Sequence, residues 1–204
     1  GWSRLALTAT ILITMDIPLF PLRTVLFPDG PLPLRIFESR YIDMISHCMK
    51  HDSAFGVLLI REGQEDGTAT THEVGTLATI TDWYQGSDGL LGVTAAGGQR
   101  FRLLSVRRQA DGLNIGTVEM IPPEPDMVLP EEYASLKKIL ESVLDDLGRL
   151  YETLERRFDD AVWVTYRLIE ILPIDLQEKQ RLLESNDTLE RLKLIDRVMN
   201  SARR

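Results

Sequence analysis

The chain has 204 residues, 44% apolar and 26% charged, so it can bury the core of one large domain or two small ones. Its formal net charge is −8, and acidic residues outnumber basic ones both before and after Pro130. Neither half is a basic module, which argues against nucleic-acid binding as the main task.

Cys48 is the only cysteine, so the chain can form neither an internal disulfide nor a cysteine-based zinc site. This usage fits a reducing cytoplasm. The apolar segment 5–13 is too short to span a bilayer and lacks a cleavage site typical of signal peptides, so we expect no membrane association. Met15 directly precedes a proline-rich run, and we interpret residues 1–14 as an upstream or vector-derived segment.

That run lies in the most apolar part of the chain, IPLFPLRTVLFPDGPLPLRIFESRY, residues 17–41, and contains five of the ten prolines. Proline fixes φ and has no backbone donor, so no helix can pass through, and no central strand can use every ladder bond. The stretch predicts short extended pieces joined by turns.

Up to residue 121, short apolar runs alternate with four Asp-Gly turn signals, which begin at Asp29, Asp66, Asp88 and Asp111. Strands are predicted at 17–22, 34–37, 54–61, 75–84, 90–95, 99–108 and 113–121. One helix interrupts them, with Ser39 as its predicted N-cap. Its predicted apolar face is Tyr41, Ile42, Ile45, Cys48 and Met49.

The segment IPPEPDMVLP, residues 121–130, holds four prolines and predicts an extended linker. Beyond it, helical periodicity covers 131–154 and 160–172, and two more helices open at Asp175 and Asp187 with capping-box spacing. We therefore predict an α+β protein with a β-domain over 15–121, a linker over 122–130 and a helical bundle domain over 131–204.

The sequence contains no GxxxxGK[ST], GxGxxG, GxSxG or HExxH motif. His47, His51 and Asp43 share one helical face, but it is the polar face, so we interpret them as solvated rather than as metal ligands. Cys48 is on the apolar face and reads as a core residue. We expect no catalytic residue, no metal and no cofactor.

Trp83 and Tyr84 end a predicted strand, where adjacent aromatic side chains can form a contact surface. The simpler interpretation is that one of the two is a core residue and the other shields a sheet edge.

Residues 17–41, with FGVLLI, VGTLATI and GGQRFRLLSV, resemble the N-terminal substrate-binding domain of ATP-dependent Lon proteases, most closely the free-standing bacterial proteins made of that domain. WVTYRLIEILPIDLQEKQRLLESNDTLERL is similar to the helical part of the same domain. Phe20-Pro21-Leu22, Phe27-Pro28 and the run from Leu34 to Tyr41 match in residue type and spacing.

The resemblance implies a PUA-like β-barrel with one inserted helix, followed by an α-helical bundle. It implies that Phe37, Glu38, Arg40 and Tyr41 belong to a rim segment, that Glu38, Arg40 and Arg100 tie elements together, and that Gly75, like Gly97 and Gly98, serves a turn or bulge.

Full Lon proteases also carry ATPase and serine-lysine peptidase modules, whose motifs are missing here. The resemblance therefore implies a non-catalytic polypeptide-binding or adaptor protein. Its implied partners are unfolded or apolar segments and a separate protease. A monomer or weak dimer is expected. We expect the binding surface in the cleft between the two parts, with Trp83 and Tyr84 as the first residues to test. The alternatives are a PUA-like RNA-binding module, against which the acidic balance counts, and a small-ligand sensor of the kind suggested by the family relative cereblon.

Overall fold

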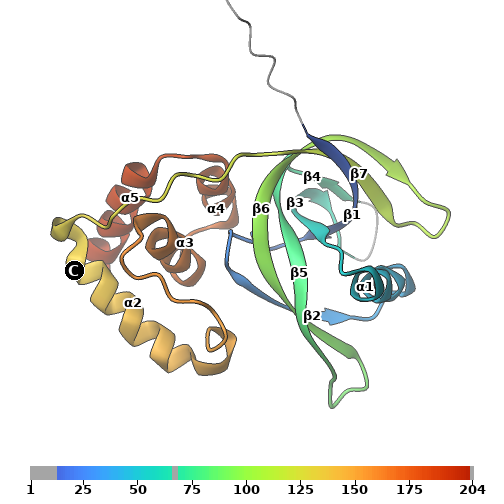
Figure 1. The fold of residues 1–204 in the computed structure, drawn as a ribbon, viewed down its shortest axis with the longest axis horizontal. Helices are drawn as coiled ribbons and strands as arrows, with labels where there is room; N and C mark the ends of the chain where they lie inside the picture. Colours follow the sequence, from blue (N-terminus) through green and yellow to red (C-terminus); the bar gives the residue numbers. More distant parts are fainter. Residues whose placement is uncertain (1–12, 66–68, 203–204) are drawn as a thin grey trace, which may run out of the picture.

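The structure is a computed structural model that describes residues 13–65 and 69–202. In this part of the chain, the strands are β1 (Thr14–Leu22), β2 (Pro31–Ile36), β3 (Phe55–Gly63), β4 (Ala69–Thr71), β5 (Val74–Gln85), β6 (Leu91–Arg108) and β7 (Asn114–Met120). The α-helices are α1 (Ser39–His51), α2 (Ala134–Leu147), α3 (Ala161–Ile171), α4 (Leu176–Glu184) and α5 (Thr188–Ser201). The strands and α1 form one side of the molecule, and α2–α5 form the other (Figure 1).

The strand pairings of the sheet form a closed ring that begins and ends at β1. β1 pairs in parallel with β3 and antiparallel with β7. From β7 the order continues through β6 and β5 back to β3. Among the described strands, β2 pairs with β6 alone and the three-residue β4 with β3 alone, so each has a free edge. Beyond Ala78, β5 also pairs with β6 alone.

The predicted break between strands 90–95 and 99–108 is wrong, because β6 continues through both. Thr76 pairs with Arg100 and Ala78 with Gly97, so Gly98 and Gln99 lie opposite Leu77 alone. The two glycines therefore mark a β-bulge, which bends a long strand without ending it.

β2 begins at Pro31, three residues before the predicted start, and it ends before Phe37. Gly97 donates to the carbonyl of Gly30, so alternate positions from Gly30 onward turn their backbone groups toward β6. Pro31 and Pro33 occupy the intervening positions, so the two backbone nitrogens that carry no hydrogen face away from β6. This explains why an edge strand of this sheet can contain two prolines.

Helix α1 starts one residue earlier than predicted. Ser39 is its first residue and Glu38 is the N-cap, so the predicted cap is wrong. Its buried face consists of Tyr41, Met44, Ile45 and Cys48. Ile42 and Met49, which periodicity placed on that face, are exposed because both lie along one margin of it, seven residues apart.

The predicted helix 131–154 is too long. A 3-10 turn covers Glu131–Tyr133, and α2 then ends where Gly148 takes a φ of 53°. A residue with positive φ stops the helical ladder, and glycine adopts a positive φ without steric cost. The later helix starts are confirmed: Asp160, Asp175 and Asp187 are N-caps whose carboxylates accept backbone N–H groups.

The helical side has its own apolar cluster, but Phe27 and Val74 of the β-rich region are buried in it. The linker is also attached to the helices, because buried Arg191 donates to Glu124 at 2.7 Å. The division into domains at 121 and 131 stays a prediction. The predicted turn at Asp66 and residues 1–12 of the predicted upstream segment lie outside the described residues. Thr14, the last residue of that segment, pairs with Glu119 in the sheet.

Candidate functional site

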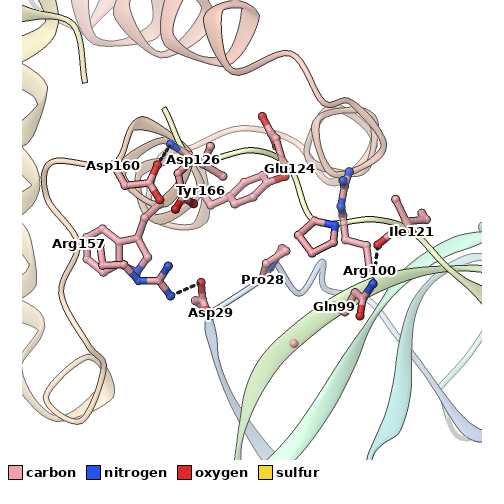
Figure 2. A pocket seen from close by; sticks show the side chains of 14 residues that line it. Pro28, Asp29, Gln99, Arg100, Ile121, Glu124, Asp126, Arg157, Asp160 and Tyr166 are labelled. Atoms are coloured by element: carbon pink, nitrogen blue, oxygen red, sulfur yellow. Dashed lines mark hydrogen bonds and ion pairs between the residues drawn. The ribbon is translucent and has the colours of Figure 1, made fainter. Parts of the chain in front are cut away.

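A cleft of about 340 Å³ lies where β6, the linker and the start of α3 meet. Its apolar lining includes Pro28, Ile121, Pro123, Val162, Trp163 and Tyr166. Figure 2 shows polar side chains around these walls, with Arg157 and Asp29 at one end and Gln99 and Arg100 at the other.

The β6 bulge forms the sheet side of the cleft. Gly98 and Gln99 line the cleft, and the Gln99 amide donates to the Ile121 carbonyl at 2.9 Å. Arg100 also lines it but is only 3% exposed. Its guanidinium donates to the Leu183 carbonyl at 2.9 Å and to the Asn186 side chain. The bulge thus directs two consecutive side chains into contacts with the linker and with the α4–α5 loop.

Glu124 forms the linker side. Its carboxylate accepts hydrogen bonds from Arg191 and Thr188, and from the Tyr166 hydroxyl at 3.0 Å. Burial raises the pKa of Tyr166 to about 12. The phenol is therefore a neutral donor at pH 7, and it holds the linker against α3.

The N-terminus of α3 closes the third side. Asp160 accepts from the backbone N–H groups of Val162 at 3.0 Å and Met127 at 3.3 Å. Arg157 donates to the Asp29 carboxylate at 3.1 Å and so bridges the helical and β-rich regions. Arg157 and Asp29 are thus bonded to each other, while Arg100, Glu124 and Asp160 are bonded to side chains or backbone groups of the surrounding protein. The apolar walls, together with exposed Asp126, are the surface left for a ligand.

Trp83 and Tyr84 do not lie in this cleft. They are near the end of β5, in the β5–β6 hairpin that projects away from α2–α5 (Figure 1). Their side chains are 58% and 50% exposed, so the interpretation that one of them is a core residue is wrong. Trp83 lines a separate hollow beside α1, whereas the Tyr84 ring covers Gly92.

The family-motif residues divide between two places. Phe20 stacks on Tyr41 with ring centroids 4.1 Å apart inside the β-rich core. Phe27 instead packs on Tyr166 in the helical cluster, with centroids 5.2 Å apart. Pro21 is buried. The Pro28 carbonyl accepts from buried Arg167 at 2.6 Å, beside the cleft that Pro28 lines.

The rim segment forms a second hollow. Arg40 donates to Glu38 at 2.7 Å and to the Gly112 carbonyl at 3.0 Å. Phe37 is 62% exposed and, with Phe20 and Tyr41, lines a mostly apolar groove of about 470 Å³ that we call the rim groove. The motif residues thus also border an open apolar surface, which sequence reasoning did not assign to them.

Gly75 lies inside β5, where a Cβ atom would sit 2.2 Å from the Val57 carbonyl oxygen. It is the close approach of β3, and not a turn, that requires glycine here.

Within residues 13–65 and 69–202, no three His, Cys, Asp or Glu side chains are grouped as a metal site would need. His47 and His51 stack on each other, and the His51 ring contacts the His47 carbonyl at 2.9 Å. None of the described helices is long and apolar enough to cross a membrane.

The sequence led us to expect a binding surface between the two parts, which stays a prediction, and it did not identify most of the residues that line the cleft found there. Ile121, Pro123 and Glu124 were interpreted only as a linker. A single signal pointed to them: a carboxylate among closely spaced prolines in a segment that must stay extended.

The profile of the family described as the ATP-dependent protease La (LON) substrate-binding domain matches residues 16–201. The crystal structure of a Lon N-terminal domain protein from Xanthomonas campestris is 34% identical, with a TM-score of 0.72, over 89% of this chain and 96% of that one. The N-terminal domain of a Mycobacterium avium complex Lon protease shares the fold, with a TM-score of 0.64 at 15% identity over 91% of this chain and 98% of that one.

Lon protease 2 of Myxococcus xanthus is 25% identical over 200 residues, which are 94% of this chain and 24% of that protein. This chain therefore spans about a quarter of the length of the curated relative it matches.

Proposed function

Because the chain belongs to the family of the Lon substrate-binding domain, we propose that it is a non-catalytic module that binds unfolded or apolar polypeptide segments. The observation that supports this proposal most directly is the cleft of Figure 2, whose walls are largely apolar and most of whose charged groups are already bonded within the protein. A site of this kind accepts side chains and offers no nucleophile with a base beside it.

We also propose the finer architecture: a PUA-like barrel over residues 15–121, a linker, and a helical bundle over 131–204. The ring of strand pairings from β1 through β7, β6, β5 and β3 supports the barrel. The buried contacts of Phe27 and Arg100 with the helical side favour a fixed arrangement of the two parts.

Polypeptide recognition needs either an apolar groove or a free strand edge. The free edges within the described chain are β2, the three-residue β4 and the outer half of β5, beside which the end of α1 lies. β2 lacks outward donors at Pro31 and Pro33, so an added strand would lose alternate hydrogen bonds. We therefore propose binding through side-chain contacts in the cleft and the rim groove.

Two alternatives are weaker. For RNA binding, the densest basic group lies along β6, but Arg100 is buried and Arg107 donates to Asp16 at 2.8 Å, so these residues form no common basic stripe. For a small ligand, the cleft is at the low end of the usual range of about 300 to 1,000 Å³. Most of its charged groups are also already bonded within the protein.

The test is a titration of the protein with a fluorescently labelled, permanently unfolded polypeptide. The native form of the protein from which this unfolded chain is prepared, and a single-stranded RNA, serve as controls across a salt series. We expect binding to the unfolded chain that depends little on salt. Absence of that binding, or steeply salt-dependent binding to RNA alone, would overturn the proposal.

Pro123→Asp tests the cleft itself, because it puts a carboxylate on an apolar wall. We expect about tenfold weaker polypeptide binding, the loss typical of an unpaired polar group in an apolar contact. Pro122→Asp is the matched control, since Pro122 is an exposed neighbour that does not line the cleft. Equal affinities of the two variants would exclude the cleft as the contact surface.

An adaptor role, in which bound segments are passed to a separate protease, is part of the proposal, as is a monomeric or weakly dimeric state. Degradation of an unfolded client by a Lon protease, in the presence and absence of this protein, tests the adaptor role. Sedimentation velocity with and without that client measures the oligomeric state.

A further inference from the structure

A hollow of about 310 Å³ lies between the end of α1 and the outer half of β5, apart from the cleft. Its lining includes Cys48, Met49, Asp52, Ile80, Asp82 and Trp83. We call it the Trp83 hollow.

The apolar part of this hollow is open to solvent. The Trp83 side chain is 58% exposed and Met49 is 41% exposed. Met49 belongs to the helical stripe that the sequence predicts to be core, and Trp83 ends a strand whose first half is buried. Met49, which its helical spacing predicts to be buried, and Trp83 are thus both exposed at one place, and grouped exposed apolar side chains mark a contact surface.

The charged side chains that line the hollow are all negative. Asp52 and Asp82 contribute carboxylates, and no Lys or Arg lines it. One Asp82 oxygen accepts the backbone N–H of Trp83 at 2.9 Å, which leaves its other oxygen for a ligand. Lys50 and His51 are in the same last turn of α1, but neither lines the hollow.

The end of α1 adds to this field. Asp52 is the C-cap, with a left-handed φ of 49°, and its N–H bonds to the Cys48 carbonyl. The last carbonyls of a helix carry the negative end of its dipole, which attracts cations. An exposed indole face attracts a cation as well. Carboxylates, helix terminus and indole therefore all favour a positive charge flanked by apolar groups.

We propose that the Trp83 hollow binds a lysine or arginine side chain of the polypeptide, with apolar neighbours of that residue on Trp83 and Met49. This inference rests on the proposed polypeptide-binding function and specifies its substrate class. Segments that combine basic and apolar residues would be preferred over neutral or acidic ones, which also suits a protein of net charge −8.

The test uses two synthetic unstructured peptides that share every Leu, Val and Ala position and differ only in carrying Lys or Gln at the remaining sites. We expect about tenfold tighter binding of the Lys peptide at low salt, the combined effect of a cation–π contact and partly exposed charge pairs. The Asp52→Asn/Asp82→Asn double variant should lose most of this preference, because only the indole and the helix terminus still favour the Lys peptide. Asparagine tolerates the left-handed conformation at 52 and keeps the acceptor at 82.

The matched control is Glu132→Gln/Asp146→Asn, which removes the same charge from exposed positions in the α2 region, on the opposite side of the molecule from α1 (Figure 1). It should retain the preference for the Lys peptide. Loss of the preference in this control would show that the net charge of the protein causes it, and would overturn the inference. Trp83→Ala should weaken binding of the Lys peptide more than binding of the Gln peptide, and should leave the circular dichroism spectrum of the protein unchanged.

Equal binding of the two peptides to the wild-type protein would overturn this inference and leave the proposed function standing. Binding of neither peptide, together with no binding of the unfolded polypeptide, would overturn both.

Discussion

At the scale of single residues, two adjacent glycines in β6 have different roles. A Cβ atom on Gly97 would lie 2.1 Å from the backbone oxygen of Phe27, which cannot move without disturbing the chain that enters the helical cluster. A Cβ atom on Gly98 would meet its nearest neighbour, the Leu77 oxygen, at an ordinary 3.6 Å.

We therefore expect Gly97→Ala to lower the free energy of unfolding by about 2 to 3 kcal/mol. Gly98→Ala should stay within about 0.5 kcal/mol of the wild type. Urea denaturation followed by circular dichroism measures both variants, and similar losses in the two would contradict the structure around the bulge.

Cys48 is 2% exposed, and burial raises the pKa of its thiol. The reactive thiolate is therefore scarcer at pH 8 in the folded protein than in the unfolded chain. We expect native Cys48 to be alkylated by iodoacetamide about 100-fold more slowly than in urea. Mass spectrometry follows the reaction, and rates within about threefold of each other would show that the thiol is accessible.

At the scale of elements, β2 shows how proline protects an edge. Its outward positions 31 and 33 carry no donor, so neighbouring molecules cannot extend the sheet there. Pro31→Val/Pro33→Val supplies both donors and raises β-propensity.

We expect this double variant to self-associate more strongly than the wild type at the same protein concentration, as measured by sedimentation velocity. It should also lose about 1 kcal/mol of stability, because the unfolded chain becomes more flexible. Pro122→Val/Pro125→Val, in the exposed linker, serves as the control and should leave association unchanged. A double variant that behaves like this control would show that the prolines do not protect the edge.

At the scale of the whole molecule, buried polar contacts join the two sides. Arg191 is fully buried, and Glu124 is its carboxylate partner at 2.7 Å. Arg100 and Gln180 link the sheet to α4 in the same way, since Arg100 donates to the Leu183 carbonyl and Gln180 to the Val74 carbonyl at 3.0 Å. Both sides should therefore unfold together.

Glu124→Ala leaves the Arg191 guanidinium buried without its carboxylate. We expect a loss of about 3 to 5 kcal/mol in the free energy of unfolding. Asp145→Ala breaks the exposed pair with Arg156 and should cost no more than about 1 kcal/mol. Chemical denaturation compares the two variants, and equal small losses would mean that the linker is not anchored through Glu124.

Local chemistry explains which elements the sequence could predict. Helix starts at Asp160, Asp175 and Asp187 depend on a side chain and a backbone N–H two or three residues away, so spacing alone identifies them. The continuity of β6 through Gly97 and Gly98 depends on partners on both sides of the strand, which no local pattern contains.

By itself, the sequence determined the class of the protein, the change from strands to helices near residue 130 and the family, because periodicity, capping and motif spacing are properties of neighbouring residues. Only the tertiary structure decided which apolar residues stay exposed. Phe37, Met49 and Trp83 resemble core residues along the chain, yet they border hollows, because burial depends on which distant elements pack over a side chain. The pairings of Glu124 with Arg191 and of Asp29 with Arg157 were decided in the same way, since each joins residues far apart in sequence.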